Sequence, residues 1–188
     1  MAPANSSLGE LLQSFSPRSS AERRDVARVK EVLDEPNPWD RSLPLHCTGS
    51  AIVVHPESCC VLLRWHERLE RWLQVGGHAE PGDATPFEVA AREALEETGL
   101  RDLATWPDPE RPTLLQVVVV PVPAGKGEPA HEHADLRFLL ATSDPSAALP
   151  ETEGARLRWL PVADAIDEVE EDNLEECLRR AACLLDSQ

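Results

Sequence analysis

Long apolar runs and an excess of basic residues are both missing from this sequence. No apolar stretch approaches the ~18 residues that a transmembrane helix needs, and residues 1–5 contain no basic segment leading into an apolar one. We therefore expect neither a membrane anchor nor a secretory signal. Lys and Arg total 18 against 34 Asp and Glu, a formal net charge of −16. This sign disfavours nucleic acid and anionic membrane surfaces as partners.

Cysteine is also sparse and irregularly spaced. The chain has 5 cysteines and no C-x-x-C pair, which argues against a disulfide framework or a structural zinc site. We therefore expect reduced thiols and a cytoplasmic location. What the sequence does contain, 41% hydrophobic and 28% charged residues over 188 positions, is typical of one globular core.

The hydrophobic pattern divides the chain into two parts. Residues 1–44 predict an N-terminal helical extension, in which Ser7 and Ser19 each begin a capping box with a glutamate three residues later. Residues 45–188 predict the main domain, which ends in a helix capped by Asn173. Apolar, β-rich runs predict its strands at residues 49–54, 59–65, 72–75, 114–122, 136–141 and 156–160. The fold class is therefore mixed α/β, with a central sheet covered by helices on both faces.

One helix after a glycine-rich loop is specified unusually well. Thr85 is the predicted N-cap, Pro86 occupies the first helical position, and Glu88 completes a capping box. Gly99 fits the left-handed position that ends a helix. The sequence therefore predicts a helix from Pro86 to the residue before Gly99.

Three glutamates share one side of this helix, and their negative charges destabilise the helix there. Glu93 repels Glu96 and Glu97 by about 0.2–0.5 kcal/mol per pair, and the last helical turn disfavours anions. One interpretation is a solvated acidic face. The other is a site for Mg²⁺ or Mn²⁺, which prefer carboxylate oxygens.

The surrounding residues resemble the Nudix box, whose pattern is G-x5-E-x7-R-E-U-x-E-E-x-G-U with U aliphatic. Residues 92–100 read R-E-A-L-E-E-T-G-L and match its second half. In the first half, five residues separate Gly77 from Asp83, where the family prefers glutamate. Eight residues, instead of seven, then precede Arg92. We interpret residues 77–100 as a loop variant of the box, because an insertion in a loop costs little.

The resemblance implies a Nudix-type α/β/α sandwich with a mixed sheet. It also implies a hydrolase that uses Mg²⁺ or Mn²⁺ to cleave a diphosphate bond in a nucleoside diphosphate-linked substrate. By position, the metal ligands would be Glu93, Glu96, Glu97 and the carbonyl of Gly76. Arg92 would belong to the catalytic set in a structural role, paired with an acid such as Asp83. Glu93 is the first choice for the general base.

Further polar residues are candidates for the substrate site. His78 adjoins the box glycines, and Arg64 lies near the predicted hairpin. If residues 131–137 extend into a strand, His131 and His133 face one way together with Asp135 and Arg137; the alternative is a polar face of an edge strand. The loop predicted at residues 123–134 offers Glu128 and Glu132 as alternative bases.

Several alternatives remain open at this stage. A Nudix-fold module could bind a nucleotide or protein without catalysis, and a prenyl diphosphate isomerase would need a catalytic cysteine. The spacing His131-x-His133-x-Asp135 also suggests a dinuclear zinc hydrolase. That class needs further histidine ligands close by, but Leu136 stands where another histidine would help to bind the metal.

The resemblance also limits the substrates and partners that we expect. The chain has no tyrosine, and so lacks the one associated with dinucleoside polyphosphate hydrolases. Leu115 stands near the place of the proline that marks many ADP-ribose hydrolases. The implied partner is a small nucleotide-type molecule, with a homodimer as an open alternative and no nucleic acid or membrane.

Overall fold

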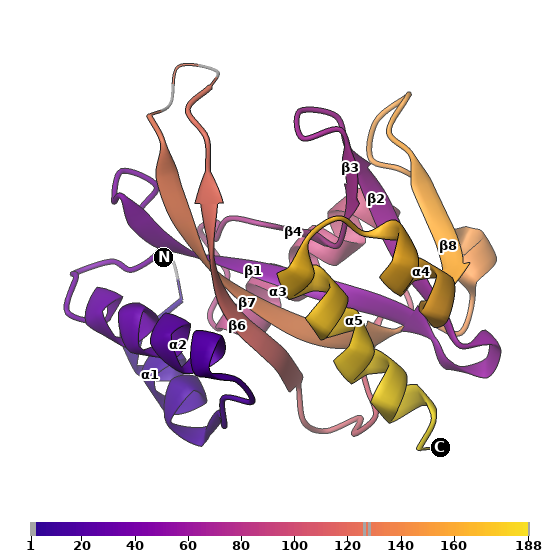
Figure 1. Cartoon of the computed structure of the whole chain (residues 1–188), viewed down its shortest axis with the longest axis horizontal. Helices are drawn as coiled ribbons and strands as arrows, with labels where there is room; N and C mark the ends of the chain where they lie inside the picture. Colours follow the sequence, from indigo (N-terminus) through magenta and orange to yellow (C-terminus); the bar gives the residue numbers. More distant parts are fainter. Residues whose placement is uncertain (1–2, 126, 128, 188) are drawn as a thin grey trace.

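The computed structural model describes residues 3–125, 127 and 129–187. They form one mixed sheet and five α-helices (Figure 1). The strands are β1 Leu45–His55, β2 Cys60–His66, β3 Arg71–Leu73, β4 Val75–Gly77, β5 Ala104–Thr105, β6 Thr113–Val122, β7 His131–Ala141 and β8 Leu157–Pro161. The helices are α1 Asn5–Ser14, α2 Ser20–Val32, α3 Pro86–Thr98, α4 Val162–Glu168 and α5 Asp172–Leu185.

The parallel pair β1 and β7 forms the centre of the sheet. It runs in register from Leu45↔Glu132 to Val54↔Ala141. β1 also pairs antiparallel with β2 and β4, and β7 with β5 and β6. The alternative of a polar edge strand at residues 131–137 is therefore wrong, because β7 has neighbours on both sides. The strand also begins five residues earlier than the predicted 136, because pairing with β1 and β6 holds its polar half extended.

Helices cover both faces of this sheet, which confirms the predicted α/β/α sandwich. Successive residues of β1 point to opposite faces, so Val53 packs in one apolar cluster and Ile52 in the other. The first cluster contains residues of α1, α2 and α3, and the second contains residues of α4 and α5. The α4–α5 cluster begins at Ile52 on β1, so it does not extend to the polar residues nearer the start of that strand.

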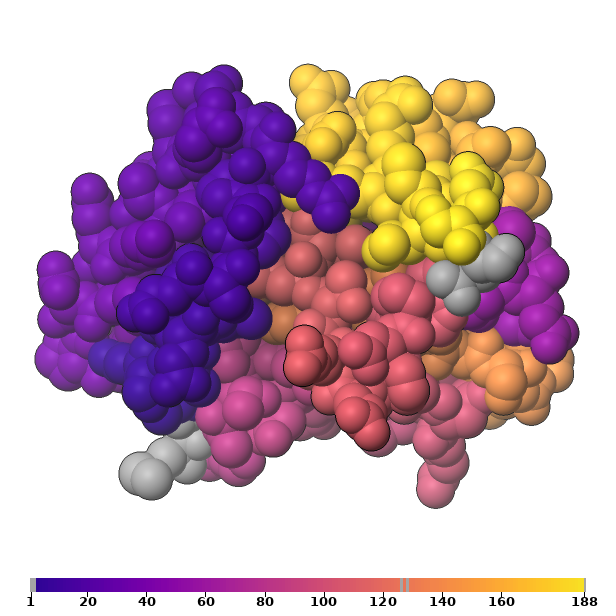
Figure 2. Space-filling model, turned by 90° about the horizontal axis from the view of Figure 1, so that it is seen from below, coloured from indigo at the N-terminus to yellow at the C-terminus, as the bar shows by residue number. Residues whose placement is uncertain are grey.

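A buried ion pair joins the N-terminal helices to the C-terminal one. Glu22 at the start of α2 accepts a hydrogen bond of 2.7 Å from Arg180 of α5, and both side chains are 3% exposed. On the surface, Arg28 of α2 pairs with Glu132 of β7. Figure 2 shows the indigo N-terminal part of the chain in contact with the yellow C-terminal part. Removing one partner of such a buried pair costs more than removing both, because one charge is left buried and unpaired.

The helix starts confirm two predicted caps and correct two others. Thr85 and Ser19 are N-caps whose hydroxyls accept from the backbone N–H three residues later. Ser7 lies inside α1, which begins after Ala4 without a side-chain cap, so the capping box predicted there is wrong. Asn173 is likewise inside α5, which begins one residue earlier. Both errors reflect a shift of one turn or less, which tertiary packing decides.

All five cysteines are free thiols. Burial raises the pKa of Cys47 and Cys177 to about 12, so neither is a reactive thiolate at neutral pH. No helix within the described ranges combines the length and apolar character needed to cross a bilayer.

Candidate functional site

A pocket of about 320 Å³ lies where the polar halves of β1 and β7 meet the end of α3. Its apolar wall includes Leu69, Leu73, Val120 and Val122. Its polar lining includes Glu97 of α3, Arg64 of β2, His78 after β4, and His131, His133, Asp135 and Arg137 of β7. A concave, partly apolar site with a few convergent polar groups is typical of small-molecule binding.

Glu97 reaches furthest into the pocket of the three glutamates on α3. It is 9% exposed; one carboxylate oxygen accepts a hydrogen bond of 3.0 Å from the Gly76 backbone N–H, and the other lies 3.2 Å from the Arg64 guanidinium. Burial nevertheless raises the pKa of this carboxyl to about 7, against the lowering effect of Arg64. The ionised carboxylate of Glu97 therefore has too little positive charge near it to offset its burial.

Glu93 lies one turn earlier, against the glycines of β4. A Cβ atom on Gly77 would stand 2.5 Å from its Oε1, so any other residue there would push the Glu93 carboxylate away from the strand. Gly76 has φ of +152°, and a Cβ there would collide with Ser50. Burial also raises the pKa of Glu93, although Arg92 donates to it at 3.1 Å.

Arg92 ties the loop to the helix. It pairs with Asp83 at 3.2 Å, as the sequence predicts, and donates to the carbonyl of His78 at 2.7 Å. Its Nη1 donates to Glu96 at 2.8 Å. Glu96 remains 47% exposed, so of the three glutamates it stands furthest out in solvent.

These residues fit a hard divalent cation. Glu93 and Glu97 are both largely buried, and both have raised pKa values because their two arginines do not offset burial. A cation beside them would supply the missing charge. Carboxylate oxygens, with backbone carbonyls and water, are the ligands that Mg²⁺ and Mn²⁺ prefer.

A buried polar network forms the floor between the two strands. Asp135 accepts hydrogen bonds from Thr48, Ser50 and Gln74 at 2.7–3.2 Å, and its other partner is Arg137 at 2.9 Å. Arg137 is 1% exposed. The sequence placed Asp135 and Arg137 on one face but missed their partners, because the β1–β7 register that supplies them has no local signal.

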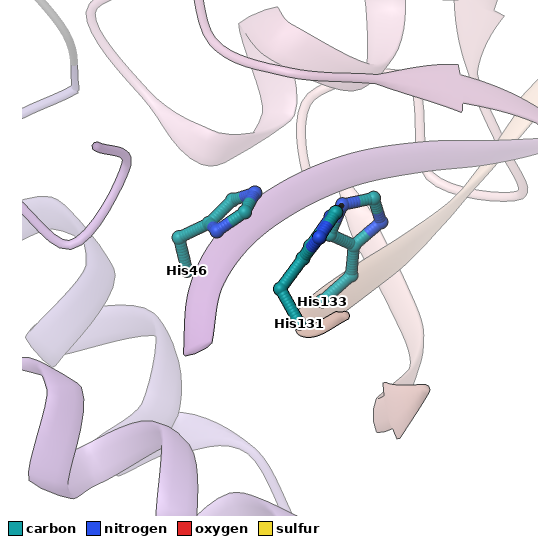
Figure 3. Close-up of side chains that lie close together, drawn as sticks. All are labelled: His46, His131 and His133. Carbon is teal, nitrogen blue, oxygen red and sulfur yellow. Dashed lines mark hydrogen bonds between the residues drawn. The ribbon is translucent and has the colours of Figure 1, made fainter. Parts of the chain in front are cut away.

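Four histidine rings gather beside the pocket, and His78, His131 and His133 line it. The sequence indicated these three, and the structure adds His46 of β1, whose ring centroid lies 4.9–5.2 Å from theirs. The centroids of His78 and His133 are 4.8 Å apart, and those of His131 and His133 are 5.0 Å apart. Figure 3 shows His46 facing the two histidines of β7. Burial lowers the pKa of His46, and lowers that of His78 to about 3 and that of His133 to about 4. These three rings are therefore neutral at pH 7.

The structure does not bring every predicted residue to the pocket. Glu132 forms a bidentate pair with Arg28 of α2, and it is not among the residues that line the pocket. Its strand neighbours His131 and His133 point to the opposite face. Glu128 lies outside the described residues. Arg64 lines the pocket, where its described ion-pair partner is Glu97.

Comparison with known protein families gives one clear match. The model of the NUDIX domain matches residues 46–181, which is more than half of the chain. This range includes the loop, α3 and most of the sheet. No curated protein matches the chain.

Solved structures share the fold at low sequence identity. A C. elegans Ap4A hydrolase in a binary complex aligns with a TM-score of 0.58 and 17% identity, covering 76% of this chain and 98% of its own. The E. coli dihydroneopterin triphosphate pyrophosphohydrolase aligns at 0.54 and 16% identity, covering 75% and 96%. RenU, a Nudix hydrolase from M. smegmatis, aligns at 0.53 and 19% identity, covering 76% and 86%.

Proposed function

We propose, from the premise that this chain belongs to the NUDIX family, that it is a hydrolase dependent on Mg²⁺ or Mn²⁺. The bond cleaved would be a diphosphate bond in a nucleoside diphosphate-linked molecule. The observation that carries this proposal is the convergence of Glu93 and Glu97 on Gly76 and Gly77 at the edge of a pocket. Binding alone does not require buried carboxylates with raised pKa values in this position.

Glu93, Glu96 and Glu97 would hold the cation, with the Gly76 carbonyl as a further ligand. When bound, the ion neutralises phosphate oxygens and lowers the pKa of a coordinated water. Arg92 would act as a positioning residue, because it fixes the loop through Asp83 and the glutamates through its remaining donors.

Glu93 is the proposed general base that takes the proton of the attacking water. A carboxylate placed next to a metal-bound water can take its proton, and Glu93 lies against the glycines of β4 beside Glu97. On the substrate side, Arg64 and Arg137 line the pocket beside its apolar wall. Arg64 can contact phosphate once a cation takes its place as the partner of Glu97.

The test is a product analysis on a panel of nucleoside triphosphates, nucleotide sugars, ADP-ribose and dinucleotides. Each would be incubated with Mg²⁺, Mn²⁺ or EDTA, and the products separated by ion-exchange chromatography. We expect turnover that needs the metal, and a loss of about 100-fold or more in Glu97→Gln. The melting temperature of the variant should stay level or rise, because Gln removes a buried charge and its repulsion from Glu93.

Glu31→Gln provides the matched control, since Glu31 is exposed on α2. It should retain full turnover. Unchanged activity in Glu96→Gln and Glu97→Gln would contradict the site assignment. Ligand-induced stabilisation without turnover on any member would favour the binding module instead.

A further inference from the structure

The histidine cluster has no part in the proposed hydrolysis, yet it is built from separate segments of the fold. His46 lies on β1 and is 1% exposed, and His131 and His133 lie on β7. The parallel register places His46 directly beside His133. His131, two residues earlier, points to the same face. Figure 3 shows the rings pointing toward one another across the two strands.

The spacing of the ring nitrogens suits a small ion. One ligand atom from each of His46, His131 and His133 lies within 4.8 Å of the others. The Nε2 atoms of His131 and His133 are 3.2 Å apart, and those of His46 and His78 are 3.1 Å apart. In tetrahedral zinc with Zn–N distances of about 2.0–2.1 Å, ligand nitrogens are about 3.3–3.4 Å apart. Within the set of His46, His131 and His133, the His131–His133 pair is already near that spacing, and side-chain rotation would have to bring the ligand atom of His46 into place.

Backbone carbonyls fix which nitrogen of two rings is free to bind. His46 Nδ1 lies 3.0 Å from the Leu43 carbonyl, and His131 Nδ1 lies 2.9 Å from the Pro129 carbonyl. A carbonyl only accepts, so each Nδ1 carries a hydrogen, and Nε2 is the nitrogen of each ring that is left to bind a metal ion. A metal-binding histidine usually donates its other ring N–H to a carbonyl or carboxylate in this way.

The donor set also selects the class of ion. Imidazole nitrogens suit zinc, copper, nickel and cobalt, whereas Mg²⁺ and Mn²⁺ prefer the carboxylate oxygens found on α3. The cluster therefore differs in chemistry from the glutamates, although His131 and His133 line the same pocket as Glu97.

We propose that His46, His131 and His133 form a second metal site, which binds one divalent ion of the zinc class. His46 and His131 bind through Nε2, and His133 supplies the third nitrogen. Three protein ligands leave one position open, as in catalytic rather than structural zinc sites. Because His131 and His133 line the pocket, a water or a phosphate oxygen can take that position. The site does not depend on the proposed hydrolytic activity.

The test is zinc binding by the full chain without a polyhistidine tag. The protein would be stripped with a chelator and dialysed to equilibrium against micromolar Zn²⁺ with millimolar Mg²⁺, and bound metal measured by elemental analysis. We expect one zinc ion per chain, with affinity at least tenfold weaker in His131→Gln. Glu97→Gln should bind zinc as the wild type does, which separates this site from the carboxylates.

His55→Gln is the matched histidine control, because His55 bonds to Ser58 outside the cluster and should bind zinc unchanged. His133→Gln is a second variant in case His131→Gln does not fold, and melting temperatures in chelator verify folding of both. Co²⁺ should give the strong visible absorption of a tetrahedral site in the wild type but not in these variants. Equal zinc affinity in folded His131→Gln and wild type, or no zinc bound at micromolar concentration, would overturn the proposal.

Discussion

Two ends of one site are built in different ways, and Glu97, His78, His131 and His133 are the members of these ends that line the pocket itself. At the carboxylate end, formed by Glu93, Glu96 and Glu97, the side chains come from two turns of α3. At the imidazole end, formed by His46, His78, His131 and His133, they come from three separate segments. Arginines hold the carboxylates, whereas backbone carbonyls and other rings hold the histidines. Charged ligands need charged partners, and neutral ligands need only hydrogen bonds.

Burial disfavours the charged form of the side chains at both ends. It raises the pKa of Glu93 and Glu97 and lowers that of His46, His78 and His133, because desolvation disfavours the charged form of either type. The neutral imidazoles are thus already in the form that binds a metal. A cation beside the carboxylates would add positive charge and so favour their ionised form.

The largest effect is expected at the floor that both ends share. Asp135→Asn removes the charge that balances Arg137, which is 1% exposed and keeps only Gln116 as a further described side-chain partner. Breaking such a buried pair costs about 3–5 kcal/mol of unfolding free energy. Urea denaturation would measure the loss.

Asp102→Asn is the control, because Asp102 is an exposed acid bonded to Thr142 and Ser143 outside the pocket. It should cost far less than Asp135→Asn. A loss below about 1 kcal/mol for Asp135→Asn would show that the ion pair does not hold the floor.

A smaller effect, which changes the carboxylate end and not the imidazole end, is expected at Arg92. Arg92→Met should lower turnover about 10- to 100-fold, the usual effect of removing a partner that orients metal ligands. Zinc affinity should stay within a factor of two or so, because Arg92 reaches the imidazole end only through the backbone carbonyl of His78. Steady-state kinetics and equilibrium dialysis would compare the two.

Arg92→Lys sharpens this test. Lysine keeps the charge but cannot make the forked contacts to Asp83 and Glu96 at once. The turnover of Arg92→Lys should therefore lie between that of Arg92→Met and that of the wild type. If zinc affinity falls in parallel with turnover, the two ends are coupled and not independent.

The smallest effect is expected at the start of α3. Thr85→Ala removes the hydroxyl that accepts from the Glu88 backbone N–H, and should cost ~1 kcal/mol. The midpoint of urea unfolding should fall with an unchanged slope. Turnover and zinc affinity should remain at wild-type levels, since both ends lie away from this cap. A midpoint equal to that of the wild type would contradict the role of the cap.

Local patterns predicted the carboxylate end well. Thr85, Pro86 and Gly99 set the limits of α3, and helical periodicity then placed the glutamates together. The ion pair of Arg92 with Asp83 also forms, although the loop departs from the family pattern. Sequence reasoning missed His46, and it left residues 131–135 undecided between a strand and a loop. Glu132 was offered as a base, but it turns to Arg28 on the other face.

The sequence by itself determined the fold class, the family and the helix that carries the glutamates, because the order of apolar runs, the box at residues 77–100 and the helix caps can each be read along the chain without knowing which distant segments pair. Only the tertiary structure decided the imidazole end and the floor of the pocket. His46 meets His133, and Thr48 meets Asp135, through the parallel pairing of β1 with β7. That pairing joins residues more than 80 positions apart, and its register is set by the packing of the whole sheet against helices on both faces.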